Sequence, residues 1–308
     1  MVEKKSLEST LNSGTKVQNL KKYQRRQIFW VSLMWLFGLI TVSILVLVVG
    51  YVLIKGGKAI NWEFIVTPPK GGISGEGGIS TTIATTFYLV GLTLLIATPL
   101  GVGAAIYLIE YAGEQSLSSK LLRTVISISN FAVETLAGIP SIIFGLFGYA
   151  LFVSTLHFGF SLLSAALAGA CLVLPTIIRT TEEALLAVPV DYRRGSLALG
   201  ATKWQTLYKV VLPAGLPGII TGIILSVGRV ISETAIFYVT LGGSYRMPTS
   251  ILDGGRTLAL HLYYLAMDTR AFDKAMGTGA VLVVMIILIN LLIDIISRKL
   301  TSGVRKVR

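Results

Sequence analysis

Two opposite charges lie at the end of an otherwise apolar run. They are Arg229 and Glu233, and the residues 210–228 before them contain no Asp, Glu, Lys or Arg. On a helix, the i,i+4 spacing places both side chains on one face. A charge inside a membrane span is costly and normally faces a bundle interior or a water-filled path. The pair therefore predicts either a structural ion pair or an anion site in which Arg229 contacts the solute and Glu233 orients Arg229.

A second polar feature, the segment 194–213, separates two apolar runs. Leu197 and Leu199 lie among its polar residues, as an amphipathic helix requires. Gly200 can adopt a positive φ, which would end one helix and redirect the chain. Pro213 is expected to stop a second helix before the next apolar run. The segment predicts a helix, a turn and a helix along a membrane face, and an ordinary interfacial helix is the alternative.

Small residues in this segment would let the backbone of another protein approach closely, and an aromatic residue could fill a groove on that protein. The small residues are Gly195, Ser196 and Ala201, and the aromatic residue is Trp204. A stiff helix that is held by a partner can pass a rigid-body movement to the spans beside it. These features predict a coupling loop.

The composition predicts an integral membrane protein. The 308 residues are 53% hydrophobic and 14% charged, whereas a soluble domain carries about 25% charged residues. Long runs without Asp, Glu, Lys or Arg recur along the chain, and roughly 20 apolar residues suffice to cross the hydrocarbon core. We expect an all-α protein with six transmembrane helices at about 27–54, 82–109, 125–151, 160–178, 214–242 and 275–297.

The distribution of Lys and Arg predicts that both termini are cytoplasmic. With the N-terminus inside, the inner segments hold 19 of the 27 basic residues, as the positive-inside rule requires. The segment 194–213 then faces the cytoplasm. The expected organisation is a basic cytoplasmic tail (1–26), a first transmembrane helix (27–54), an external loop (55–81), a core of five helices with a coupling loop at about 182–213 (82–298), and a cytoplasmic tail (299–308).

Several function classes are disfavoured. The net charge of +12 suggests nucleic acid, but the basic residues lie beside apolar runs and fit contact with membrane lipid instead. Cys171 is alone, and His157 and His261 are too far apart for a metal site. The chain has no G-x-x-x-x-G-K-[ST] phosphate cradle, so we expect no ATPase site and no bound cofactor or metal.

The spacing of the polar segment resembles the E-A-A-x3-G-x9-I-x-L-P cytoplasmic loop of ABC importer permeases. The resemblance implies a loop that docks an ATPase belonging to another chain. Arg194 stands where this family usually has Glu, which affects the contact chemistry at that end. The residues that the resemblance assigns to the loop are Arg194, Gly195, Ser196, Gly200, Ala201, Trp204, Leu212 and Pro213.

Three further stretches, 99–112, 138–148 and 228–235, resemble the phosphate-specific transport permeases of PstA type. The resemblance covers about residues 80–298 and implies the type I ABC importer permease fold. In that family an intramembrane Arg that matches Arg229 is linked to phosphate movement. Ser232 stands where Gly is usual, which would narrow the path slightly.

The resemblance also implies the partners. These are a second permease of PstC type, two ATPase subunits of PstB type that use ATP and Mg, and an external phosphate-binding protein of PstS type. Such a permease is a multi-pass protein of the bacterial or archaeal plasma (inner) membrane. It forms half of the translocation pathway and is not itself an enzyme.

Two other functions compete with phosphate import. One is an ABC importer permease for another oxyanion, sulfate or molybdate, and the other is a transporter driven by ion gradients alone. In addition, Glu134 adds a charge to the third expected span. Pro140 is expected to kink that helix, and Gly138, Gly145 and Gly148 to allow close helix packing.

Overall fold

The computed structural model describes residues 2–71, 75–111 and 120–305 of the chain. Residues 72–74 of the expected external loop, residues 112–119 of the expected core and residues 306–308 of the expected C-terminal tail lie outside the described residues. The chain divides into two compact units, Met1–Ile54 and Lys55–Arg308.

The first unit consists of a single helix that extends slightly beyond it. α1 (Val2–Gly57) runs without a break through the predicted basic tail and the predicted first span. Its apolar part, Arg26–Gly57, has 32 residues, which is more than the roughly 20 that a membrane crossing requires.

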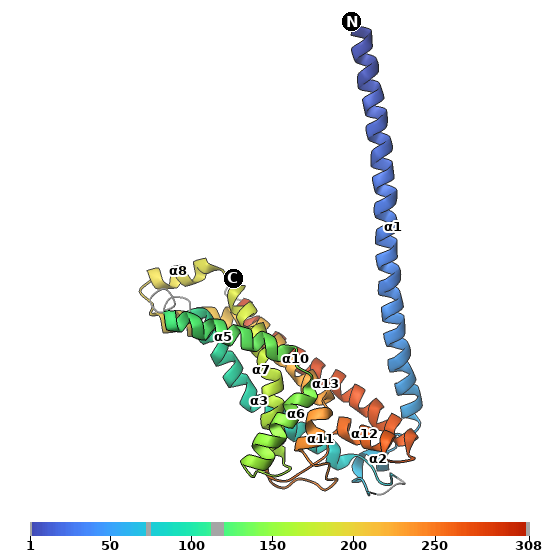
Figure 1. The fold of residues 1–308 in the computed structure, drawn as a ribbon, viewed down its shortest axis with the longest axis vertical. Coiled ribbons are helices and arrows are strands. Elements are labelled where there is room, and N and C mark those ends of the chain that lie inside the picture. Colours follow the sequence, from blue (N-terminus) through green and yellow to red (C-terminus); the bar gives the residue numbers. More distant parts are fainter. Residues whose placement is uncertain (1, 72–74, 112–119, 306–308) are drawn as a thin grey trace. The chain divides into compact units, whose positions relative to one another are not determined.

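The second unit is built around α7, which packs against both α3 and α10; Figure 1 shows these helices gathered in one bundle. Five helices in the described part of the chain are long and apolar enough to cross a membrane, and a bent helix pair makes six, as the sequence predicts. The long helical segments of this unit are α3 (Ser80–Ile106) with the π-helical turn η1 (Tyr107–Tyr111), α5 (Lys120–Ala137), α7 (Leu162–Leu186), α10 (Leu212–Ser232) and α13 (Phe272–Arg305).

Shorter helices connect and cap these spans. They are α2 (Trp62–Val66), α6 (Ser141–Gly148) with η2 (Tyr149–Thr155), α8 (Val190–Ala198), α9 (Lys203–Thr206) with η3 (Leu207–Val211), α11 (Ala235–Thr240) and α12 (Leu258–Met267). Helices are the only extended regular structure in the described ranges, where two isolated β-bridges also occur.

The third expected span is broken rather than kinked. Its two parts, Ile126–Ala137 and Ser141–Thr155, meet at an angle of 108°. Pro140 is the N-cap residue of α6, with an extended ψ of 138°. Proline cannot donate a backbone hydrogen bond and its ring clashes with the preceding turn, so the helix stops before it. The sequence located this break but not its size.

The fifth expected span is also broken, and the sequence did not predict this. α10 ends at Ser232, Glu233 is extended with ψ 133°, and α11 begins at Ala235. The short helices that follow the two breaks, α6 and α11, pack closely against each other. A Cβ added at Gly145 of α6 would lie only 3.0 Å from the Ile236 Cα of α11, so glycine permits this approach. The predicted packing role of Gly145 is thus confirmed.

The prediction that Pro213 ends the second helix of the polar segment is wrong. Helical structure continues from Lys203 to Ser232. Just before Pro213 the chain forms the π-helical turn η3, in which the Leu212 N–H bonds to the Leu207 carbonyl. This wider turn shifts the hydrogen bonding by one residue, so the chain accommodates a residue that has no N–H.

Glycines set the distance between α7 and α10. A Cβ at Gly222 would collide with the Thr180 hydroxyl group, and one at Gly218 would lie 2.5 Å from the Ala184 Cβ. Gly228, in the same helix, faces open space. Small residues at such contacts permit the close backbone approach on which helix packing in membranes depends.

Replacing Gly222 with alanine should therefore destabilise the protein by about 1–3 kcal/mol, because α7 and α10 must move apart. The matched change Gly228→Ala should leave stability equal or higher, since alanine favours helix and meets no neighbour. Thermal unfolding of the purified protein in detergent measures both. Equal midpoints for the two variants would contradict this role of Gly222.

Candidate functional site

The structure separates the two charges that the sequence pairs. Arg229 lies exposed in the last turn of α10, whereas Glu233 is buried with 7% of its surface accessible. The helix ends between them, so they do not share one regular helical face. Among the described residues, none accepts a hydrogen bond from the Arg229 guanidinium.

Glu233 acts on the backbone instead. One carboxylate oxygen, Oε1, accepts the N–H groups of Thr234 and Ala235, both at 3.2 Å. These donors lie at the start of α11, where backbone N–H groups have no partner within the helix. Glu233 therefore stabilises the break between α10 and α11, and Arg229 remains a cation without a bonded counter-charge in the described structure.

The polar segment has the predicted helix–turn–helix form. α8 is followed by Gly200, whose φ of +84° is in the left-handed region. Thr202 then begins α9 through a capping box, in which its side chain accepts the Gln205 N–H and the Gln205 side chain accepts the Thr202 N–H. The Ser196 and Thr206 hydroxyls lie 2.9 Å apart. Ser196 thus joins the two helices as well as being small.

The outward side of this segment carries exposed apolar side chains. Leu199 is 91% exposed and Trp204 is 62% exposed. The Trp204 ring stacks on Tyr208 with 6.4 Å between ring centroids. Gly195 is exposed with open space around it, and Arg194 is also exposed. The other predicted residues, Ala201, Leu212 and Pro213, are half-buried.

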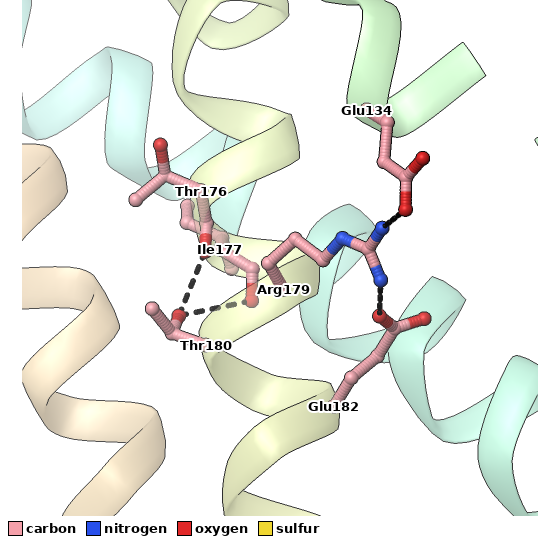
Figure 2. A network of polar contacts seen from close by, with 6 residues as sticks. All are labelled: Glu134, Thr176, Ile177, Arg179, Thr180 and Glu182. Carbon is pink, nitrogen blue, oxygen red and sulfur yellow. Dashed lines mark hydrogen bonds and ion pairs between the residues drawn. The ribbon is translucent and has the colours of Figure 1, made fainter. Parts of the chain in front are cut away.

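A guanidinium links the third and fourth expected spans (Figure 2). Arg179 of α7 forms an ion pair with Glu134 of α5, and its Nη1 lies 3.3 Å from Glu182 Oε2. The side chains of Glu134 and Glu182 are 65% and 9% exposed. The sequence drew attention to Glu134 but did not reveal its partner, which lies 45 residues away.

Arg193 of α8 and Glu110 of η1 form an ion pair at 2.8 Å. Neither residue was predicted from the sequence to belong to a site. Only the positions of these two residues in the sequence could have pointed to the ion pair. Arg193 follows the end of α7 by a few residues, where a basic side chain can bind the last carbonyls of a helix. Glu110 is the first charge after the apolar run 77–109.

The segment 243–274, between the fifth and sixth expected spans, contains a helix and a packed polar cluster. The helix is α12, and in the cluster the Arg256 guanidinium lies 4.1 Å from the centroid of the Tyr264 ring. Arg256 Nε donates to the Gly243 carbonyl at 2.9 Å, and Nη1 lies 3.4 Å from Nδ1 of the buried His261. Burial lowers the pKa of Arg256 and raises that of Tyr264.

No group of three or more His, Cys, Asp or Glu residues within the described ranges is placed to hold a metal ion. The polar sites described above are Arg229, the Arg179 network, the Arg193–Glu110 ion pair, the segment 194–213 and the Arg256 cluster.

Residues 120–306 match the family of binding-protein-dependent transport system inner membrane components. The chain belongs to this family. These permeases are the membrane subunits of ABC importers, which act with ATPase and substrate-binding partners. The chain is accordingly a multi-pass membrane protein.

Relatives of this permease extend the match. A probable ABC transporter permease protein, YqgI of Bacillus subtilis, is 34% identical over 291 residues, covering 87% of this chain and 96% of its own. The phosphate transport system permease protein PstA 1 of Mycobacterium tuberculosis is 34% identical over 218 residues, covering 70% of this chain and 69% of its own. The predicted resemblance to PstA-type permeases is confirmed.

The permease fold also matches solved structures. An inward-facing structure of the MetNI methionine ABC transporter covers 72% of this chain and 94% of its own, with 26% identity and a TM-score of 0.54. A bacterial alginate ABC transporter covers 91% of this chain and 97% of its own, with a TM-score of 0.63 and 16% identity. The predicted type I importer fold is confirmed.

Glu233 provides a test of the helix break. Glu233→Ala removes the acceptor for two N–H groups, and we expect it to lower stability by about 0.5–2 kcal/mol, as loss of a capping side chain does. Glu233→Gln keeps an oxygen acceptor and should lower it less. Thermal unfolding compares them, and two equally stable variants would contradict the capping role.

We expect the stability of the protein to depend on pH through His261, which lies outside the candidate spans. Burial, Arg256 and Lys274 lower the pKa of His261 from 6.5 to about 4. Between pH 6.5 and about pH 4, the unfolded chain binds a proton at His261 that the folded chain does not. The contribution of His261 to the free energy of unfolding is therefore fully present above pH 6.5 and is lost as the pH falls towards 4. The loss reaches up to about 3 kcal/mol.

Unfolding midpoints measured from pH 7.5 down to 4 check this, with His261→Gln as the comparison. The variant should lose less stability than the wild type over the acidic part of the range. Parallel curves for the two proteins would show that His261 does not titrate in this way.

Proposed function

We propose that this chain is the permease subunit of an ATP-driven phosphate importer. It forms half of the translocation pathway with a second permease of PstC type. Two ATPases of PstB type supply the energy and an external PstS-type protein delivers phosphate. The assembly belongs to a bacterial or archaeal plasma membrane, with both termini of this chain in the cytoplasm.

The substrate is inferred chiefly from the relatives. Phosphate transport permeases from Mycobacterium tuberculosis, Mycobacterium leprae and Haemophilus influenzae are 34–35% identical to about 70% of this chain.

The chemistry of Arg229 supports an anionic solute. An exposed guanidinium at the end of a candidate span is costly in lipid and becomes favourable beside water or an anion. A planar guanidinium suits the bidentate binding of phosphate oxygens. Glu233 is occupied by backbone N–H groups, so it does not neutralise Arg229 directly.

The cytoplasmic segment supports docking of an ATPase. Its exposed residues Leu199 and Trp204 offer an apolar surface, and Gly195 leaves room for close approach of a partner backbone. Arg194, in the place of the usual Glu, adds a positive charge to this surface. It should therefore meet an acidic or neutral position on the ATPase.

The test is uptake of labelled phosphate by proteoliposomes that contain this chain with its second permease, ATPases and binding protein. We expect ATP-dependent uptake that excess sulfate or molybdate does not reduce. Arg229→Ala should lower uptake roughly tenfold or more, as expected from loss of hydrogen bonds to a charged group, and Arg229→Lys should lower it less.

Arg246→Ala serves as the matched control, because Arg246 is exposed in the external loop away from the spans. It should leave uptake unchanged. Competition by sulfate or molybdate would assign the permease to another oxyanion. Full uptake by Arg229→Ala would remove that residue from the pathway.

A further inference from the structure

One arginine closes the turn between α7 and α8. Arg193 Nη2 donates to the Leu185 carbonyl and Nη1 donates to the Val188 carbonyl, both at 2.8 Å. The last carbonyls of a helix have no partner within it. Arg193 thus donates from α8 to one carbonyl in the last turn of α7 and to one carbonyl of the connection 187–189, so a side chain bridges this short connection.

The same guanidinium also binds a third element. Arg193 Nη2 and Nε donate to Glu110 Oε1 of η1, at 2.8 and 3.1 Å. The two side chains are only 19% and 12% exposed. An ion pair that is largely shielded from water is screened less by salt than a surface pair, so this contact resists separation.

An apolar cluster lies at the same end of the bundle. Leu185, Val188, Leu207 and Val211 are buried together, and Ile109 of η1 packs against them. The hydrogen-bonding contact between the Ser196 and Thr206 hydroxyls then ties α8 to α9. The cytoplasmic ends of α3 and α7 and the segment α8–η3 thus form one connected block.

The neighbouring arginine is different. Arg194 is exposed, and none of its side-chain atoms bonds to a residue within the described ranges. Two adjacent arginines on one helix therefore separate two functions. One side chain faces a docking partner, and the other fastens the helix to its own chain.

We propose that Arg193 is the positioning residue that makes α8 move as one body with the cytoplasmic ends of α3 and α7. Displacement of α8 by an ATPase then reaches the helices that line the pathway. Without Arg193, the side-chain bridge from α8 to the end of α7 and to η1 would be lost, and α8 could pivot at the connection 187–189. This inference rests on the proposed docking of an ATPase at 190–213.

The first test measures the movement and requires no solute. Spin labels at Asp191→Cys on α8 and Tyr107→Cys on η1, both exposed positions, are introduced into the complete transporter with Cys171→Ala. We expect the same narrow distance distribution in the ADP-bound and ATP-bound states. Arg193→Ala should broaden or shift the distribution when ATP binds, and Arg246→Ala, at an exposed position outside the docking segment, should leave it unchanged.

The second test measures coupling as phosphate transported per ATP hydrolysed. Arg193→Ala should lower this ratio roughly fivefold or more, in the range of typical coupling energies, while ATP hydrolysis continues. Arg193→Lys should recover part of it. Glu110→Gln, which keeps the carbonyl contacts of Arg193, should have an intermediate effect and provides a second variant should Arg193→Ala fail to assemble.

A narrow, unchanged distance in Arg193→Ala, or a transport-to-ATP ratio equal to that of the wild type, would overturn the inference. Absence of phosphate uptake by the wild-type complex would instead overturn the proposed substrate, and the distance measurement would still decide the role of Arg193.

Discussion

Close approach of helix backbones around α7 is the constraint on which the other features of this permease depend. In a membrane, apolar side chains gain little by leaving lipid for protein, so helix association depends on fitted packing and small residues. Gly101 of α3 faces Ile177, and Gly222 of α10 faces Thr180. α7 therefore packs closely against both of these helices.

The two helix breaks follow from this packing. Non-helical backbone at membrane depth is tolerated only where its polar groups find partners within the protein. Glu233 supplies such partners at the break before α11. The short helices α6 and α11 then pack through Gly145, while Gly148 approaches Ala168 of α7. The broken spans are thus supported by the same central helix.

The arginine side chains of this bundle differ in their bonding partners. Arg179 lies between Glu134 and Glu182, and Arg193 binds Glu110 and two carbonyls. Arg256 rests on an aromatic ring outside the spans. The first three tie segments of the chain together. Arg229 has no such bonded partner among the described residues.

The sequence alone determined the class of this protein. Charge-free runs give the number of spans, because about 20 apolar residues cross a bilayer. The spacing around Gly200 gives the turn between α8 and α9, because few residues besides glycine accept a positive φ readily. Pro140 marks a helix break for a reason that is equally local. These features depend on a residue and its close neighbours in the chain.

Only the tertiary structure decided what the charged side chains do. The i,i+4 rule pairs Arg229 with Glu233 if the helix continues, but packing of α11 on α6 ends α10 at Ser232 and turns Glu233 to the backbone. The pairing of Arg193 with Glu110 spans 83 residues, and no local pattern encodes it. Such contacts are set by which helix ends the fold brings together, and that is a property of the packed chain rather than of any segment.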